Sequence, residues 1–106
     1  MELQTIQEQI ELALKYFDSK NLALADSKAH YEEANEFKKT KLAICEMLHG
    51  GNTQAEITRN AHASKEYQEF LTDLALKRVE YYRLKHEYDA KSSIFEGLRS
   101  LNKNLQ

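Results

Sequence analysis

The sequence predicts an all-α protein built as an antiparallel hairpin of two long helices. The 106 residues include no proline and only three glycines, and two of these, Gly50 and Gly51, are adjacent near mid-chain. On both sides of this pair, apolar side chains recur every three and four positions, which is the spacing of one face of an α-helix. With 42% hydrophobic and 30% charged residues, the chain has the composition of a folded protein. We therefore expect one helical domain over residues 1–106.

The first long helix is expected over about residues 2–49. Its apolar stripe comprises Leu3, Ile6, Ile10, Ala13, Phe17, Leu24, Tyr31, Ala34, Cys45 and Leu48. Lysine and serine occupy several intervening stripe positions, so this stripe is weaker than the one in the second half. Residues 18–21 are rich in helix-capping side chains. They favour a break or kink there, which would let Leu22 and Leu24 change register.

The turn is expected at Gly50 and Gly51, because glycine adopts the left-handed conformation that ends many helices. Thr53 is followed three positions later by Glu56, the spacing of a capping box. This pair predicts a short helix over about residues 54–62. Ser64 then has the position of an N-cap for the last helix.

The last helix is expected over about residues 64–104. One seven-residue repeat along it places nine apolar residues on a single helix-packing stripe: Tyr67, Phe70, Leu74, Tyr81, Leu84, Tyr88, Phe95, Leu98 and Leu105. Lys77, Lys91 and Asn102 interrupt this stripe. The spacing of Asp73 from Lys77, and of Glu87 from Lys91, predicts two ion pairs four residues apart.

A hairpin of two helices buries only one seam. Apolar residues outside the stripe widen the apolar face beyond what one facing helix covers; they include Leu71, Leu76, Val79, Tyr82, Ile94 and Leu101. We therefore expect a homodimer that forms a helical bundle, or a higher oligomer.

No motif in the sequence points to catalysis, and we expect neither an enzyme nor a cofactor. Glu46 and His49 have the Glu-x-x-His spacing of di-iron bundles, but such sites need two pairs and two further carboxylates, so no metal is expected. Cys45 lies among apolar residues and is expected to be a buried structural thiol. The absence of a signal sequence or an apolar span indicates a soluble cytoplasmic protein.

Residues from about 33 to the end resemble a family of small helical proteins that tailed phages and prophages encode beside single-strand-annealing recombinases. The resemblance lies in Ala61-x-Ala63-Ser64-x-x-Tyr67, Phe70-Leu71-x-x-Leu74, Tyr82-x-Leu84-Lys85 and the closing Arg99-Ser100 with Lys103. The chain departs from the family in having fewer basic residues at its end. The resemblance implies an accessory of phage DNA metabolism in the cytoplasm of a bacterial host cell, with Lys85, Arg99 and Lys103 as candidate contacts to a partner or nucleic acid.

The leading hypothesis is a non-enzymatic helical interaction module that acts in DNA recombination or replication through protein–protein contacts. Its partner would be a recombinase, a single-strand-binding protein or a host nuclease. A second hypothesis is direct binding of single-stranded DNA, because cations between Lys77 and Lys103 are interleaved with tyrosines. A third is a host-takeover inhibitor of a bacterial nuclease or defence complex, with Glu32, Glu33 and Glu36 imitating phosphates.

Overall fold

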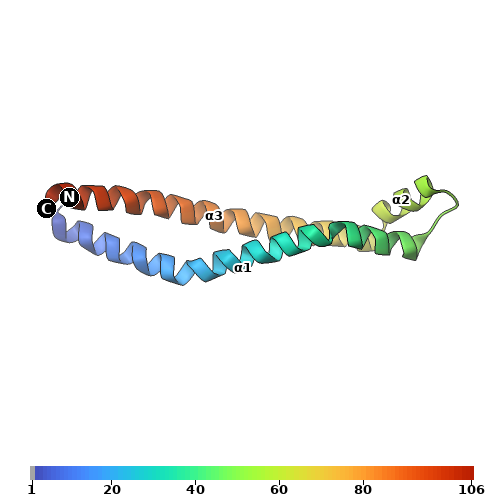
Figure 1. Ribbon diagram of the computed structural model, residues 1–106, viewed down its shortest axis with the longest axis horizontal. Helices are drawn as coiled ribbons and strands as arrows, with labels where there is room; N and C mark the ends of the chain where they lie inside the picture. The colour runs from blue at the N-terminus through green and yellow to red at the C-terminus, as the bar shows by residue number, and fades with distance from the viewer. Residues whose placement is uncertain (1) are drawn as a thin grey trace. The chain divides into compact units, whose positions relative to one another are not determined.

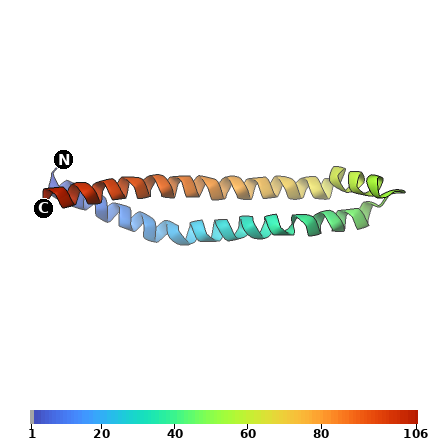
Figure 2. The same ribbon diagram turned by 45° about the horizontal axis from the view of Figure 1, so that its top comes forward.

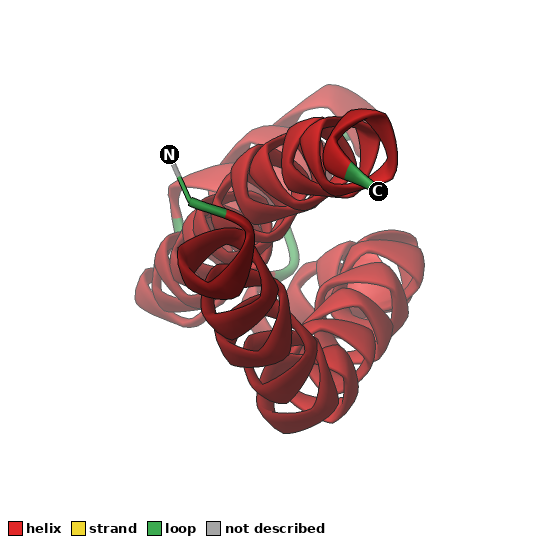
Figure 3. Ribbon diagram, turned by 90° about the vertical axis from the view of Figure 1, so that its left-hand side faces the viewer, coloured by secondary structure: helices red, strands yellow, loops and turns green. Residues whose placement is uncertain are grey.

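The computed structural model describes residues 2–106, which form three α-helices and no strand. Helix α1 spans Leu3–His49, α2 spans Gln54–Ala63 and α3 spans Lys65–Leu105 (Figure 1). Figure 3 shows helix throughout the described chain except for short connecting and terminal segments. The all-α prediction is confirmed, and each helix begins and ends within one residue of its expected bounds.

The predicted break near residues 18–21 is wrong, because α1 continues through this segment without interruption. The Ser19 hydroxyl donates a hydrogen bond to the carbonyl oxygen of Tyr16, three residues earlier, at 2.9 Å. This bond satisfies the serine hydroxyl within the helix, so Ser19 does not need to end the helix in order to form a hydrogen bond. Leu24 is half-buried and Leu22 is exposed in the unbroken helix, so no change of register is needed.

The connection after α1 depends on one left-handed residue and one capping threonine. Gly50 has a φ of +59°, and its N–H donates to the carbonyl of Glu46 at 3.0 Å. The Thr53 hydroxyl accepts from the N–H of Glu56 at 3.1 Å, so the predicted N-cap of α2 is confirmed. The Glu56 carboxylate accepts from the N–H of Asn52 at 2.8 Å, one residue before the donor that a capping box would use.

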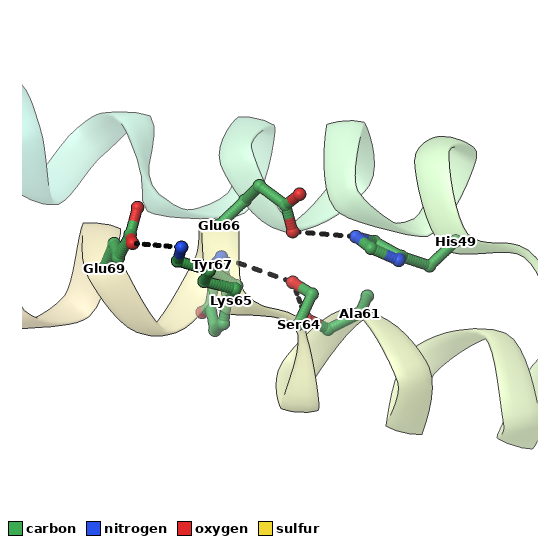
Figure 4. A network of polar contacts seen from close by, with 7 residues as sticks. All are labelled: His49, Ala61, Ser64, Lys65, Glu66, Tyr67 and Glu69. Atoms are coloured by element: carbon green, nitrogen blue, oxygen red, sulfur yellow. Dashed lines mark hydrogen bonds and ion pairs between the residues drawn. The ribbon is translucent and has the colours of Figure 1, made fainter.

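Ser64 joins α2 to α3 and serves both helices (Figure 4). Its hydroxyl donates to the carbonyl of Ala61 at 2.7 Å and accepts from the N–H of Tyr67 at 3.2 Å. Its own carbonyl accepts from the N–H of Gln68 at 3.0 Å. The side chain is buried, so both hydrogen bonds are shielded from water. The predicted N-cap of α3 is confirmed.

The chain divides into two compact units. Unit 1 contains the chain up to Asp26 and from Tyr81 onward, and unit 2 contains Ser27–Glu80. In unit 1 the beginning of α1 and the end of α3 lie side by side (Figures 1 and 2). The centroid of the Phe17 ring lies 5.0 Å from the centroid of the Tyr88 ring and 5.5 Å from that of the Phe95 ring. These aromatic contacts join the two helices of unit 1.

In unit 2 the α1 and α3 segments run in opposite directions. Phe37 of α1 contacts Phe70 of α3, whereas His49, later in α1, contacts Glu66, earlier in α3. The core of this unit consists of Cys45, Ala61 and Tyr67, with Leu42, Phe70 and Leu71 packed against them. Because Ala61 belongs to α2, all three helices contribute to this small core.

The residues of the predicted α3 stripe differ in burial. Tyr67 and Leu74 are buried, and the half-buried members are Phe70, Tyr81, Leu84, Tyr88, Phe95 and Leu98. Leu105 of the stripe on α3 and Leu48 of the stripe on α1 are exposed, so these two predictions were wrong. Both residues lie in the last turn of their helix. The seven-residue repeat continues there, but no other part of the described chain buries these two side chains.

Candidate interaction surfaces

Unit 2 has an open groove between α1 and α3 with a volume of about 620 Å³. Its apolar surface includes Phe37 of α1 and Phe70 of α3, whose rings meet edge to face with centroids 6.1 Å apart. Phe37 remains 44% exposed despite this contact. A further apolar side chain can therefore pack against the uncovered part of its ring.

A row of exposed apolar side chains continues from the groove along α1. Besides Phe37, this α1 apolar row contains Ile44, Met47 and Leu48. The spacings of seven and four residues place Phe37, Ile44 and Leu48 on one helical face, and Met47, three residues after Ile44, lies at the edge of that face. Met47 is 86% exposed, although a methionine side chain favours apolar contact. The row is a surface suited to packing.

The groove carries an excess of negative charge. Glu33 and Glu36 line it on α1, and Asp73 and Lys77 line it on α3. The Asp73–Lys77 ion pair, predicted from their spacing, is present. Glu33 and Glu36 form no ion pair within the described residues. The groove therefore presents two carboxylates without a cationic partner.

An exposed imidazole–carboxylate contact lies beside the α2–α3 junction (Figure 4). Nε2 of His49, at the end of α1, lies 2.8 Å from Oε2 of Glu66, in the first turn of α3. The pKa of Glu66 is lowered from its ordinary value, first by a backbone hydrogen bond and then by the hydrogen bond with His49. The arrangement favours an ionised carboxylate, and it joins α1 directly to α3.

Unit 1 contains a tyrosine between charged groups. The Tyr16 hydroxyl donates to Oε1 of Glu87 at 3.0 Å, and Nζ of Lys91 lies 5.6 Å from the centroid of the Tyr16 ring. Partial burial and the bond to Glu87 raise the pKa of Tyr16. The predicted Glu87–Lys91 pair does not form, because Glu87 pairs with Arg83 at 3.7 Å. Lys91 interacts with the aromatic ring instead.

The three predicted contact residues are exposed side chains on α3 of unit 1. Lys85 and Arg99 lie fourteen residues apart and Lys103 four further on, so their spacing places them on one side of the helix. Arg99 forms an ion pair with Glu96 at 3.2 Å and lies 5.8 Å from the centroid of the Phe95 ring. Part of the charge on this side is therefore neutralised within the chain.

The other predicted features are also placed by the structure. Cys45 is fully buried as a free thiol, which corresponds to the structural role expected of it. His49 of the Glu-x-x-His spacing contacts Glu66 rather than Glu46. Within residues 2–106, no three histidine, cysteine or acidic residues gather as metal ligands would. No helix in that part of the chain is long and apolar enough to cross a bilayer.

The apolar residues predicted to lie outside the stripe are exposed, with one exception. Leu71 packs against the unit 2 core, so its expected exposure was wrong. Those that remain exposed are Leu76, Val79, Tyr82, Ile94 and Leu101.

Sequence reasoning missed the groove and the α1 apolar row. Their signal was present in the sequence as a second periodic series on the first helix, formed by Phe37, Thr40, Ile44 and Met47. The main stripe of that helix obscured this series. The contact of Tyr16 with Glu87 had no such signal, because one helix pattern does not give the register between two helices.

Comparisons with known proteins identified no relative of this chain. The chain matches no protein-family model, and searches of curated proteins and of solved structures gave no significant match.

Proposed function

We propose that this protein is a non-enzymatic helical interaction module that folds as an antiparallel hairpin and pairs with a second copy in a helical bundle. The amount of apolar surface that one chain leaves uncovered supports this proposal. Among residues 2–106, five hydrophobic side chains are buried, whereas thirteen large ones are exposed. Single exposed apolar residues are ordinary, but a set of this size is typical of a surface that another molecule covers.

We place this module in phage or prophage DNA recombination or replication, as a partner of a recombinase, a single-strand-binding protein or a host nuclease. The resemblance to phage-encoded proteins supports this assignment. In the segment that carries the resemblance, Ala61, Ser64 and Tyr67 form the buried α2–α3 junction. A shared junction favours a shared fold. Arg99 and Lys103 are exposed and do not belong to this junction, so the junction does not determine what they bind.

The contacts around the cations favour a protein partner over single-stranded DNA. Arg83 and Arg99 are paired with glutamates on their own helix. Tyr81 and Tyr88 are half-buried, so neither ring is fully open for stacking on a base. Direct DNA binding through these four side chains would need their present contacts to be released.

A pull-down tests the proposal. The tagged protein is offered the purified products of the genes beside its own, including any recombinase or single-strand-binding protein, at micromolar concentration. We expect one of them to be captured, and we expect a variant carrying Lys85→Glu, Arg99→Glu and Lys103→Glu to capture less. A matched control makes three charge reversals at other exposed cations, Lys15→Glu, Lys20→Glu and Arg59→Glu. Failure to capture any product contradicts the assignment to recombination.

A separate titration with a labelled single-stranded oligonucleotide tests the alternative function, which is direct binding of single-stranded DNA. Binding that weakens steeply with added salt would indicate a DNA-binding accessory, and a flat titration would exclude it.

A further inference from the structure

The groove of unit 2 has the features of a site for an apolar anchor. Phe37 and Phe70 supply an aromatic surface, and Phe37 is 44% exposed. Residues 37–48, which hold the α1 apolar row, rise by about 16 Å at 1.5 Å per residue. This length matches three turns of a docked helix, whose anchors recur at three- and four-residue spacing.

The charges around the groove select the kind of helix. Glu33 and Glu36 line the groove without an ion-pair partner among the described residues, while Asp73 is paired with Lys77. An occupant with lysine or arginine beside its apolar anchors would neutralise the two carboxylates. An acidic occupant would be repelled.

The same charges argue against a second copy seated face to face on this groove. A two-fold contact with its axis through the groove places the groove of one chain on that of the other, so Glu33 and Glu36 of one chain would lie near their own equivalents. A two-fold contact would therefore add like charges instead of neutralising them.

We propose that the unit 2 groove and the α1 apolar row bind a basic amphipathic helix from a different protein. This inference rests on the proposed interaction function and names the chemistry of the partner. The apolar face of the bound helix packs on Phe37, Ile44 and Met47, and its cations lie beside Glu33 and Glu36.

Fluorescence anisotropy with model peptides tests the groove in the full-length protein. The probe is a labelled peptide of about 14 residues, with leucines at helical spacing on one face and lysines at the positions that flank this face. Its counterpart has glutamate in place of every lysine. At low ionic strength we expect the leucine–lysine peptide to bind and the leucine–glutamate peptide not to bind.

Two variants locate the binding site. Glu33→Gln with Glu36→Gln should weaken binding about tenfold, as expected for the loss of two exposed charge pairs. The matched control is Glu8→Gln with Glu11→Gln, because these carboxylates are also exposed, on the same helix and three residues apart; binding should not change. Phe37→Gln should also weaken binding, whereas Leu22→Gln, an exposed apolar position of α1 outside the groove, should not.

Three results would overturn this inference. The first is equal binding of the two peptides, and the second is equal weakening by the two glutamate pairs. The third is that Phe37→Gln dissociates a dimer without changing peptide binding. This result would show that a second copy covers Phe37. Circular dichroism shows whether Phe37→Gln remains helical, and the glutamate variant tests the groove even if it does not. Capture of a recombination protein by an intact chain that binds neither peptide would refute the groove and leave the proposed function standing.

Discussion

Gly97→Ala should stabilise the protein, although it fills no cavity. Gly97 is an exposed residue within α3, and a Cβ atom built on it meets nothing within 4 Å. Glycine in a helix interior is less favourable than alanine by about 0.5–1 kcal/mol, because the unfolded chain loses more freedom when it folds. We therefore expect the free energy of unfolding to rise by about that amount.

The same substitution at the other two glycines should have the opposite sign. Gly50 has a φ of +59°, and a left-handed conformation costs an L-residue about 1–2 kcal/mol. A Cβ on Gly51 would lie 2.8 Å from the backbone nitrogen of Ile57 and 3.0 Å from Cβ of Glu56. The first turn of α2 would have to move, at a cost of about 1–3 kcal/mol.

Urea unfolding followed by circular dichroism measures all three variants, at one fixed protein concentration because association would shift the midpoint. The expected order of stability places Gly97→Ala above the unsubstituted protein, and Gly50→Ala and Gly51→Ala below it. Destabilisation by Gly97→Ala would refute the reasoning that this position is open, and it would indicate that the second copy packs closely on the face that Gly97 shares with Ile94 and Leu101. Equal effects at all three positions would refute the turn geometry.

Three further substitutions test single contacts. Ser64→Ala removes the buried acceptor of the Tyr67 N–H and should lower the free energy of unfolding by about 1–2 kcal/mol. This loss should exceed that of Thr53→Ala, because the Thr53 cap is exposed. Equal losses in urea unfolding would contradict the shared-cap geometry. Because the pKa of Glu66 is lowered by folding, its stabilisation is present above the ordinary pKa and is lost as pH falls through the folded value. Acid titration followed by circular dichroism should therefore show a smaller acid-dependent loss in Glu66→Gln, and an unchanged profile would contradict the lowered pKa of Glu66. The pKa of Tyr16 is raised, so its stabilisation is lost as pH rises above about 10; Tyr16→Phe should flatten alkaline unfolding, and an unchanged curve would argue against the bond to Glu87.

Local signals in the sequence were sufficient for the helices and their ends. Thr53 and Ser64 are followed three residues later by the N–H groups that they cap, so both caps follow from neighbours in the chain. The double glycine marked the end of α1 for the same reason. The error at residues 18–21 arose because Ser19 can satisfy its hydroxyl inside a helix as well as at a cap.

Contacts between helices were less predictable. The edge-to-face contact of Phe37 with Phe70 depends on how α1 and α3 are aligned, and a periodic pattern leaves that alignment open. Leu48 followed the stripe pattern but is exposed, because periodicity does not show where a facing helix ends. Glu33 and Glu36 were noted in the sequence as possible phosphate mimics, but only the fold brings them beside the two phenylalanines.

Sedimentation equilibrium tests most directly whether a second copy covers the exposed apolar side chains. At micromolar concentration we expect a mass of about 25 kDa, twice the 12.4 kDa of one chain, with dissociation only on dilution. A mass of 12.4 kDa at every concentration, in a protein that stays helical and soluble, would contradict the proposed bundle.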